Sequence, residues 1–131
     1  MKKYTSMNPA QKSLLLVDWL HEHKGHQIVS LPLAASSNWA EFLIIVSATS
    51  VRHAQSLADG LRLWCKEQKM EFLGREGYQA GQWILVDLND IVVNIFQNPV
   101  RELYRLESLW ADAAQAALRP TEQDLENDTT N

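Results

Sequence analysis

The two-residue turn at Asn89-Asp90 is the sequence feature that most constrains how this chain can fold. A run of mostly apolar residues lies on each side of it, and a loop of two residues fixes the register of the strands that it joins. Leu88 must then face Ile91, and counting outward to the far end pairs Trp83 with Phe96. The sequence therefore predicts a β-hairpin whose cross-strand pairs are known in advance.

This register divides the hairpin into two unlike faces, because successive side chains of a strand point to opposite sides. The aliphatic face consists of Ile84, Val86, Leu88, Ile91, Val93 and Ile95. The mixed face consists of Trp83, Leu85, Asp87, Val92, Asn94 and Phe96. The aliphatic face is predicted to be core. Since an unpaired polar group inside a core costs about 1–3 kcal/mol, we expect the mixed face to be at least partly open.

An open surface that combines aromatic rings with a carboxylate and an amide is typical of a protein-binding site. Trp83 is the predicted aromatic anchor of this site. The other predicted contact residues on this face are Leu85, Asp87, Asn94 and Phe96. Leu88 and Asp90 at the turn, with Tyr104 and Glu76 nearby, are further predicted contacts, and Tyr104 could equally be a core residue. In the alternative interpretation, the two rings only close the far end of the core while the polar side chains meet water.

The rest of the chain predicts three further strands, two long helices and one short helix. Asn8-Pro9 is a good helix start, with Asn as the cap and Pro at the first helical position, and Gly25 should end that helix. A strand is expected from Gln27 to Leu33. The segment from Phe42 to Ser47 is apolar on both faces, which indicates a central strand buried on both sides.

A long amphipathic helix is predicted to follow, capped by Ser50 and running to about Lys69. Gly60 inside it costs roughly 1 kcal/mol relative to Ala, with no compensating reason visible in the sequence. A short strand around Glu71 to Leu73 should precede the hairpin. Asn98-Pro99 then starts a short helix with leucines at helical spacing.

This order of elements predicts an α/β (α+β) fold, with a mixed sheet of about five strands and helices packed mainly on one face. At 131 residues the chain is long enough for one domain with a substantial core, expected over residues 1–118. Residues 119–131 are polar and acidic, and we expect this tail to be disordered. The start lacks the apolar stretch of a secretory signal and no run approaches a membrane span, so a cytoplasmic protein is expected.

Composition argues against several kinds of site. The formal net charge of -4 disfavours a nucleic-acid binder with a broad basic face, and favours a basic protein partner. Cys65 is the single cysteine and is expected to be an inert, buried or half-buried thiol. His21 and His23 are two apart on a helix and cannot share a face, so no metal site is expected there.

No motif predicts a convincing active site, because the chain has no phosphate loop, paired-glycine fingerprint or nucleophile elbow. Asp87 and Asp90 bracket the hairpin turn and are better explained as turn formers than as metal ligands. Ser50 and His53 lie close on one helix, but a helix cap explains Ser50 more simply than a nucleophile does. The sequence thus favours recognition over catalysis, with no cofactor.

The hairpin and the segment after it resemble a known family. The run from Trp83 to Phe96, followed by Arg101-Glu-Leu-Tyr-Arg-Leu-Glu-Ser-Leu-Trp110, is similar to the signature of the ribosomal silencing factor family, RsfS or Iojap. Upstream, the segment from Glu41 to His53 and the pair Glu76-Gly77 resemble further family motifs, so the likeness covers roughly residues 11–110. Four departures from the usual family pattern are Ala48 for Gly, Glu41 for Asp, Asn89 for Gly and Asn94 for a frequent His.

The resemblance implies a protein that binds the large ribosomal subunit through its fourteenth ribosomal protein. Occupying that surface would block the small subunit from joining and would repress translation when nutrients are short. The fold implied is similar to that of nucleotidyltransferases but without their catalytic acids, so no enzyme activity is expected. Little direct nucleic-acid binding is expected because the chain is acidic, and no membrane binding because no long apolar run is present.

Two alternatives stay open at this point. One is a small nucleotidyltransferase-like enzyme that uses Asp87 and Asp90 with magnesium. The other concerns assembly, because an exposed Trp and Phe would also favour a homodimer of the free protein.

Overall fold

The computed structural model describes residues 4–33 and 40–97 of the chain. The described part contains two helices and five strands. Their bounds are α1 Pro9–Glu22, β1 His26–Pro32, β2 Phe42–Ala48, α2 Val51–Gln68, β3 Gly74–Glu76, β4 Trp83–Asp87 and β5 Ile91–Gln97. No helix in this part of the chain is long and apolar enough to cross a membrane.

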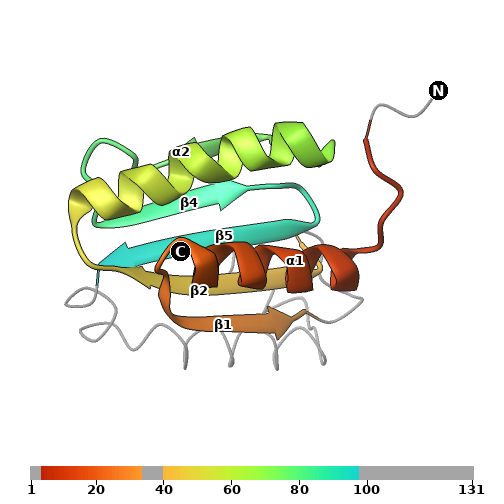
Figure 1. Cartoon of the computed structure of the whole chain (residues 1–131), viewed down its shortest axis with the longest axis horizontal. Helices are drawn as coiled ribbons and strands as arrows, with labels where there is room; N and C mark the ends of the chain where they lie inside the picture. The colour runs from red at the N-terminus through yellow and green to blue at the C-terminus, as the bar shows by residue number, and fades with distance from the viewer. Residues whose placement is uncertain (1–3, 34–39, 98–131) are drawn as a thin grey trace, which may run out of the picture.

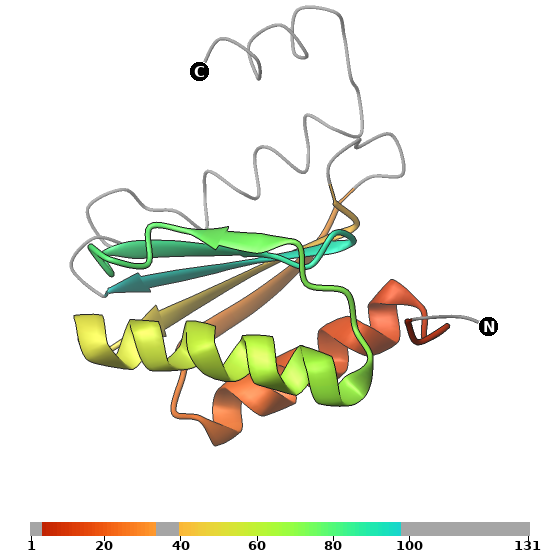
Figure 2. The same ribbon diagram turned by 90° about the horizontal axis from the view of Figure 1, so that it is seen from above.

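The five strands form one mixed sheet in the order β1-β2-β5-β4-β3 (Figure 1). The central strands β2 and β5 run parallel, and the other neighbouring pairs are antiparallel. Both described helices pack on the same face of the sheet (Figure 2). The predicted fold class, a mixed sheet of about five strands with helices mainly on one face, is therefore confirmed for the described residues.

The hairpin of β4 and β5 has the register that the turn predicts. Trp83 pairs with Phe96 at one end and Asp87 pairs with Val92 next to the turn. Asn89 has φ 78°, a left-handed conformation that Asn tolerates better than most residues. All six residues of the aliphatic face lie in the main core, 0–3% exposed, against both helices.

Side-chain caps fix the starts of both helices at the predicted residues. The Asn8 side chain accepts a hydrogen bond from the Gln11 N–H at 2.9 Å, and Pro9 follows as the first helical residue. The Ser50 hydroxyl oxygen accepts a hydrogen bond from the His53 N–H at 3.0 Å. Ser50 is therefore a helix cap, as predicted, because its oxygen is used to satisfy the free end of α2.

The third strand lies three residues later than predicted. It was expected around Glu71 to Leu73, whereas β3 spans Gly74–Glu76. Gly74 pairs with Asp87, the last residue of β4, so residues before Gly74 have no strand residue opposite them. The length of β4, which a local pattern does not reveal, sets where β3 can begin.

Gly60 has a packing reason that the sequence does not reveal. A Cβ built on Gly60 would lie 2.7 Å from Cζ2 and 2.8 Å from Cη2 of the Trp19 ring on α1. Trp19 is buried, stacks on His23 and lies close to Trp64 of α2. The Trp19 ring of α1 therefore packs against α2 at Gly60, where the lack of a side chain leaves room for it.

We expect Gly60→Ala to destabilise the protein by about 1 kcal/mol. Ala gains roughly 1 kcal/mol of helix propensity, but forcing a methyl group into a close-packed site costs about 1–3 kcal/mol. Denaturant unfolding checks this, with Trp19→Leu as the matched background. In that background the ring is gone and Gly60→Ala should become stabilising; a loss of the same size there would contradict the helix-contact explanation.

A second apolar cluster lies on the other face of the sheet from α1 and α2. It contains Ala40, Leu43, Ile45, Val92 and Phe96, with Leu31, Leu33 and Leu85 packed against it. Two members, Val92 and Phe96, belong to the mixed face of the hairpin. The mixed face is therefore continuous with a buried apolar surface across the centre of the sheet.

Candidate protein-binding site

Trp83 is the exposed aromatic residue of the mixed face. Its side chain is 42% exposed, yet its indole Nε1–H donates a hydrogen bond to Oδ1 of Asn94 at 3.0 Å. Its ring also packs against Phe96, with 4.9 Å between the ring centroids. The indole is thus held from two sides while much of its surface meets solvent.

Two residues predicted as contacts on this face are buried instead. Phe96 is 0% exposed and Asn94 is 1% exposed, so neither presents its side chain to a partner. This side of β5 belongs to the second apolar cluster, in which Phe96 lies with Leu43 and Ile45 of β2. The expectation of a partly open mixed face holds for Trp83, with Leu85 and Asp87 half-buried, and is wrong for the β5 side of the hairpin.

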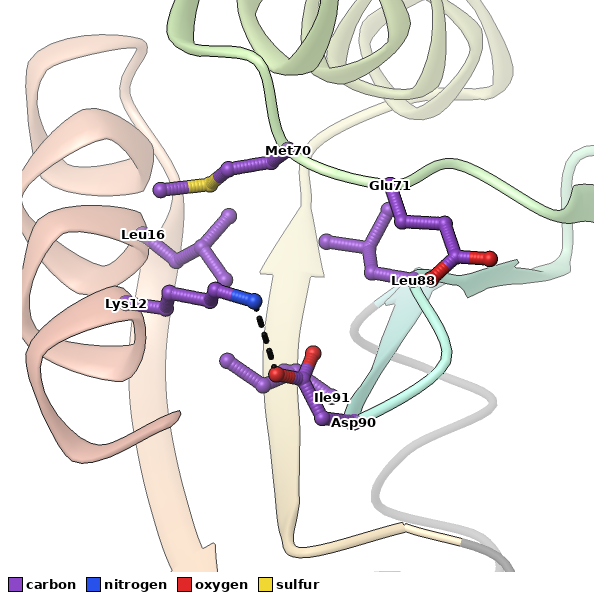
Figure 3. Close-up of a pocket in the computed structure, with 7 residues that line it drawn as sticks. All are labelled: Lys12, Leu16, Met70, Glu71, Leu88, Asp90 and Ile91. Carbon is purple, nitrogen blue, oxygen red and sulfur yellow. Dashed lines mark hydrogen bonds and ion pairs between the residues drawn. The ribbon is translucent and has the colours of Figure 1, made fainter. Parts of the chain in front are cut away.

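Leu88 and Asp90 at the turn were also predicted contacts, and the structure gives them internal roles. Leu88 is 3% exposed and belongs to the main core. Asp90 Oδ2 accepts a hydrogen bond from Lys12 Nζ of α1 at 2.8 Å, in an ion pair that lies at a small pocket (Figure 3). Leu88 is therefore a core residue, and the partly buried Asp90 already pairs with a cation of the helix layer.

Glu76 lies beside the remaining candidates. It pairs with Leu85 across β3 and β4, so the two side chains share a face of the sheet. Glu76 is exposed. We call the resulting strip the edge surface; it consists of Glu76, Trp83, Leu85 and Asp87. Tyr104, the last predicted contact, lies outside the described residues.

The edge surface carries two carboxylates, while the neighbouring cation of β3 points away from it. Arg75 alternates to the helix side of the sheet, where its guanidinium forms an ion pair with Asp59 of α2 at 2.6 Å. Tyr78 donates its hydroxyl to the other Asp59 oxygen at 2.7 Å, and its ring lies 3.7 Å from the Arg75 guanidinium carbon. This cluster fastens the segment between β3 and β4 to α2.

Sequence reasoning missed this cluster. Arg75 and Tyr78 lie 16 and 19 residues from Asp59 along the chain, and no periodicity links a helix carboxylate to an edge strand. The hydrogen bonds from Arg75 and then Tyr78 lower the pKa of Asp59 below its ordinary value of 3.8.

The Asp59 cluster should make stability depend on acid pH. Because the folded-state pKa of Asp59 is lowered, its contribution is present above pH 3.8 and is lost as pH falls through the folded-state value. The difference in melting temperature between wild type and Asp59→Asn should therefore be constant from pH 7 to about 5 and shrink towards pH 3. A difference that stays constant down to pH 3 would contradict the assignment.

The carboxylates at the turn are not arranged as a metal pair. Asp87 Oδ1 accepts the Asn89 N–H at 2.9 Å, as a turn former does, while Asp90 is bound to Lys12 on the helix side. Among residues 4–33 and 40–97, no group of three His, Cys, Asp or Glu side chains could hold a metal ion. Cys65 is buried in the core, which raises the pKa of its thiol to about 11. This arrangement gives no support to the nucleotidyltransferase alternative.

Comparison with known proteins identifies the family. The sequence model described as ribosomal silencing factor during starvation matches residues 6–131. The chain belongs to the ribosomal silencing factor family. Two relatives named ribosomal silencing factor RsfS are similar to it. The one from Halalkalibacterium halodurans is 36% identical over 79% of this chain and 89% of its own length. The one from Haemophilus influenzae is 38% identical over 73% of this chain and 94% of its own length.

More distant relatives and solved structures agree with this membership of the ribosomal silencing factor family. A mouse protein named mitochondrial assembly of ribosomal large subunit protein 1 is 27% identical over 89% of this chain and 57% of its own length. A crystal structure of a Chromobacterium violaceum protein has a TM-score of 0.75 at 30% identity, covering 80% of this chain and 88% of its own. A Bacillus halodurans structure has a TM-score of 0.67 at 35% identity, covering 76% and 94%.

Proposed function

We propose that this protein binds the large ribosomal subunit through the fourteenth large-subunit ribosomal protein. Occupation of that surface keeps the small subunit from joining, which represses translation when nutrients are limiting. The action takes place in the cytoplasm and involves no catalysis. Support comes from membership of the ribosomal silencing factor family and from the names of the relatives, which include a large-subunit assembly protein.

The observation that carries the proposal is the anchored but exposed Trp83. Protein interfaces concentrate their binding energy in a few aromatic residues that become fully buried on docking. Trp83 is available for this, since it is 42% exposed and its polar N–H is already bonded to Asn94 within the protein. A partner can therefore cover the ring without leaving an unpaired donor at the interface.

Charge supports the choice of a basic protein partner. Glu76 lies opposite Leu85 on the edge surface and Asp87 is two residues further along β4, while Arg75 is turned away into its ion pair with Asp59. Such a surface attracts a positively charged patch and steers its approach. It repels the phosphate backbone of RNA, so contact through a ribosomal protein fits the edge surface better than contact through RNA does.

Sedimentation of purified ribosomal subunits tests the proposal. The protein is mixed with large and small subunits under conditions that favour joining, and the gradient is analysed for protein and for whole ribosomes. We expect the protein to travel with the large subunit and to reduce the yield of whole ribosomes in proportion to occupancy. Binding to the small subunit, or whole ribosomes that form normally at full occupancy, would overturn the proposal.

The same gradient also examines the free protein. A homodimer formed through the exposed Trp83 would compete with docking, so Trp83→Ala should sediment more slowly than wild type when no subunit is present. Equal sedimentation of the two free proteins would remove this surface as a self-association site.

A further inference from the structure

Asn94 is a buried amide whose presence the packing of the sheet does not explain. It lies on β5 with Leu85 and Ile45 as its cross-strand partners, and it is 1% exposed. Within the part of the chain that the structure describes, its Nδ2 has no hydrogen-bond partner. A buried donor without a partner destabilises a fold, and Leu, with the same number of side-chain heavy atoms, would avoid this cost. Stability alone therefore favours an apolar residue at this position.

The other end of the same amide has a defined task. Oδ1 of Asn94 accepts the indole N–H of Trp83, and Phe96 supports the ring. An exposed side chain on a strand next to the sheet edge otherwise samples several rotamers. These two contacts restrict the indole to one orientation at the edge surface. Because the side chain is already ordered in the free protein, docking does not carry the entropic cost of ordering it.

We propose that Asn94 is a positioning residue for the proposed docking: it acts through Trp83, by holding the indole in the orientation that the partner receives. The effect of Asn94 on binding rests on the proposed function, whereas its effect on the orientation of the indole is a property of the free protein. The fold retains an amide with an unpartnered Nδ2 at this position because the Oδ1 of the same amide accepts the Trp83 N–H.

The test compares wild type with Asn94→Leu in two measurements. In the ¹⁵N-labelled free protein, the indole resonance of Trp83 is assigned by its loss in Trp83→Phe. Asn94→Leu should move this resonance and speed its hydrogen exchange, while the melting temperature stays equal or rises. Binding to purified large subunits should weaken roughly three- to tenfold, the effect of freeing one rotamer-rich side chain. Asn94→Ala serves if the Leu variant does not fold.

Two further variants separate positioning from general packing. Ile45→Val changes a buried neighbour on the same face and should lower the melting temperature without changing the indole resonance or binding. In a Trp83→Phe background, Asn94→Leu should cause no further loss of binding, because Phe has no N–H to orient. A further loss in that background, or full binding by Asn94→Leu, would overturn the proposal.

The two measurements also distinguish the failure of this inference from that of the proposed function. If wild type does not bind large subunits, the proposed function fails, and the indole resonance still decides whether Asn94 fixes Trp83. If wild type binds and the resonance and its exchange are the same in Asn94→Leu, the inference alone fails.

Discussion

Trp83→Ala is expected to weaken binding to the large ribosomal subunit by about 2–4 kcal/mol, which is roughly 30- to 700-fold in Kd. The physical reason is that the ring combines a large apolar area with an orientation already fixed by Asn94 and Phe96. Truncation removes that area from the edge surface. Titration of labelled protein with purified large subunits measures the effect directly.

The matched control for this experiment is Leu63→Ala. Leu63 is 65% exposed on α2, in the helix layer on the opposite face of the sheet from Trp83. Removing it takes away a comparable exposed apolar side chain without touching the edge surface. Binding should be unchanged in Leu63→Ala, and circular dichroism should show both variants folded. Equal binding by wild type and Trp83→Ala would remove Trp83 from the interface.

Gly77→Ala should be the most damaging single-methyl change near the site, lowering the free energy of unfolding by about 2–4 kcal/mol. Gly77 has φ 79°, where an L-residue costs roughly 1–2 kcal/mol. A Cβ there would also lie 2.2 Å from the backbone oxygen of Trp83, and overpacking costs about 1–3 kcal/mol. Since a backbone atom cannot swing aside, the start of β4 must move, and the orientation of Trp83 with it.

Gly74→Ala is the control, because Gly74 belongs to the adjacent strand and a Cβ there would meet nothing within 4 Å. Its stability should change by no more than about 0.5 kcal/mol. Denaturant unfolding gives both values, and subunit binding at a temperature where both variants are folded shows whether Trp83 has moved. If Gly77→Ala were as stable as Gly74→Ala, the close approach to Trp83 would not exist.

The sequence was a good guide wherever a local rule decides the structure. The turn at Asn89-Asp90 fixes a register that needs no tertiary information, and Asn8 and Ser50 satisfy helix ends formed by their own neighbours. The doubly apolar segment from Phe42 to Ser47 is central, as its composition predicts. Fold class follows from these elements.

The candidate site was harder to predict, because exposure depends on tertiary packing that no local pattern reveals. Trp83 and Phe96 face each other in the hairpin and look equivalent in the sequence, but Trp83 is 42% exposed and Phe96 is 0% exposed. Asp90 shows the same limit, since its partner Lys12 lies 78 residues away on α1. No rule of spacing connects those two residues.

The parallel pairing of β2 with β5 also determines when the chain can fold during its own synthesis. The middle strand of the sheet is the last described strand to be made, so β1, β2 and both helices have no completed core before Gln97 is available. At about 5–20 residues per second, the roughly 50 residues after β2 take several seconds. For that interval the apolar sides of the early elements lack the strand against which they pack in the finished sheet.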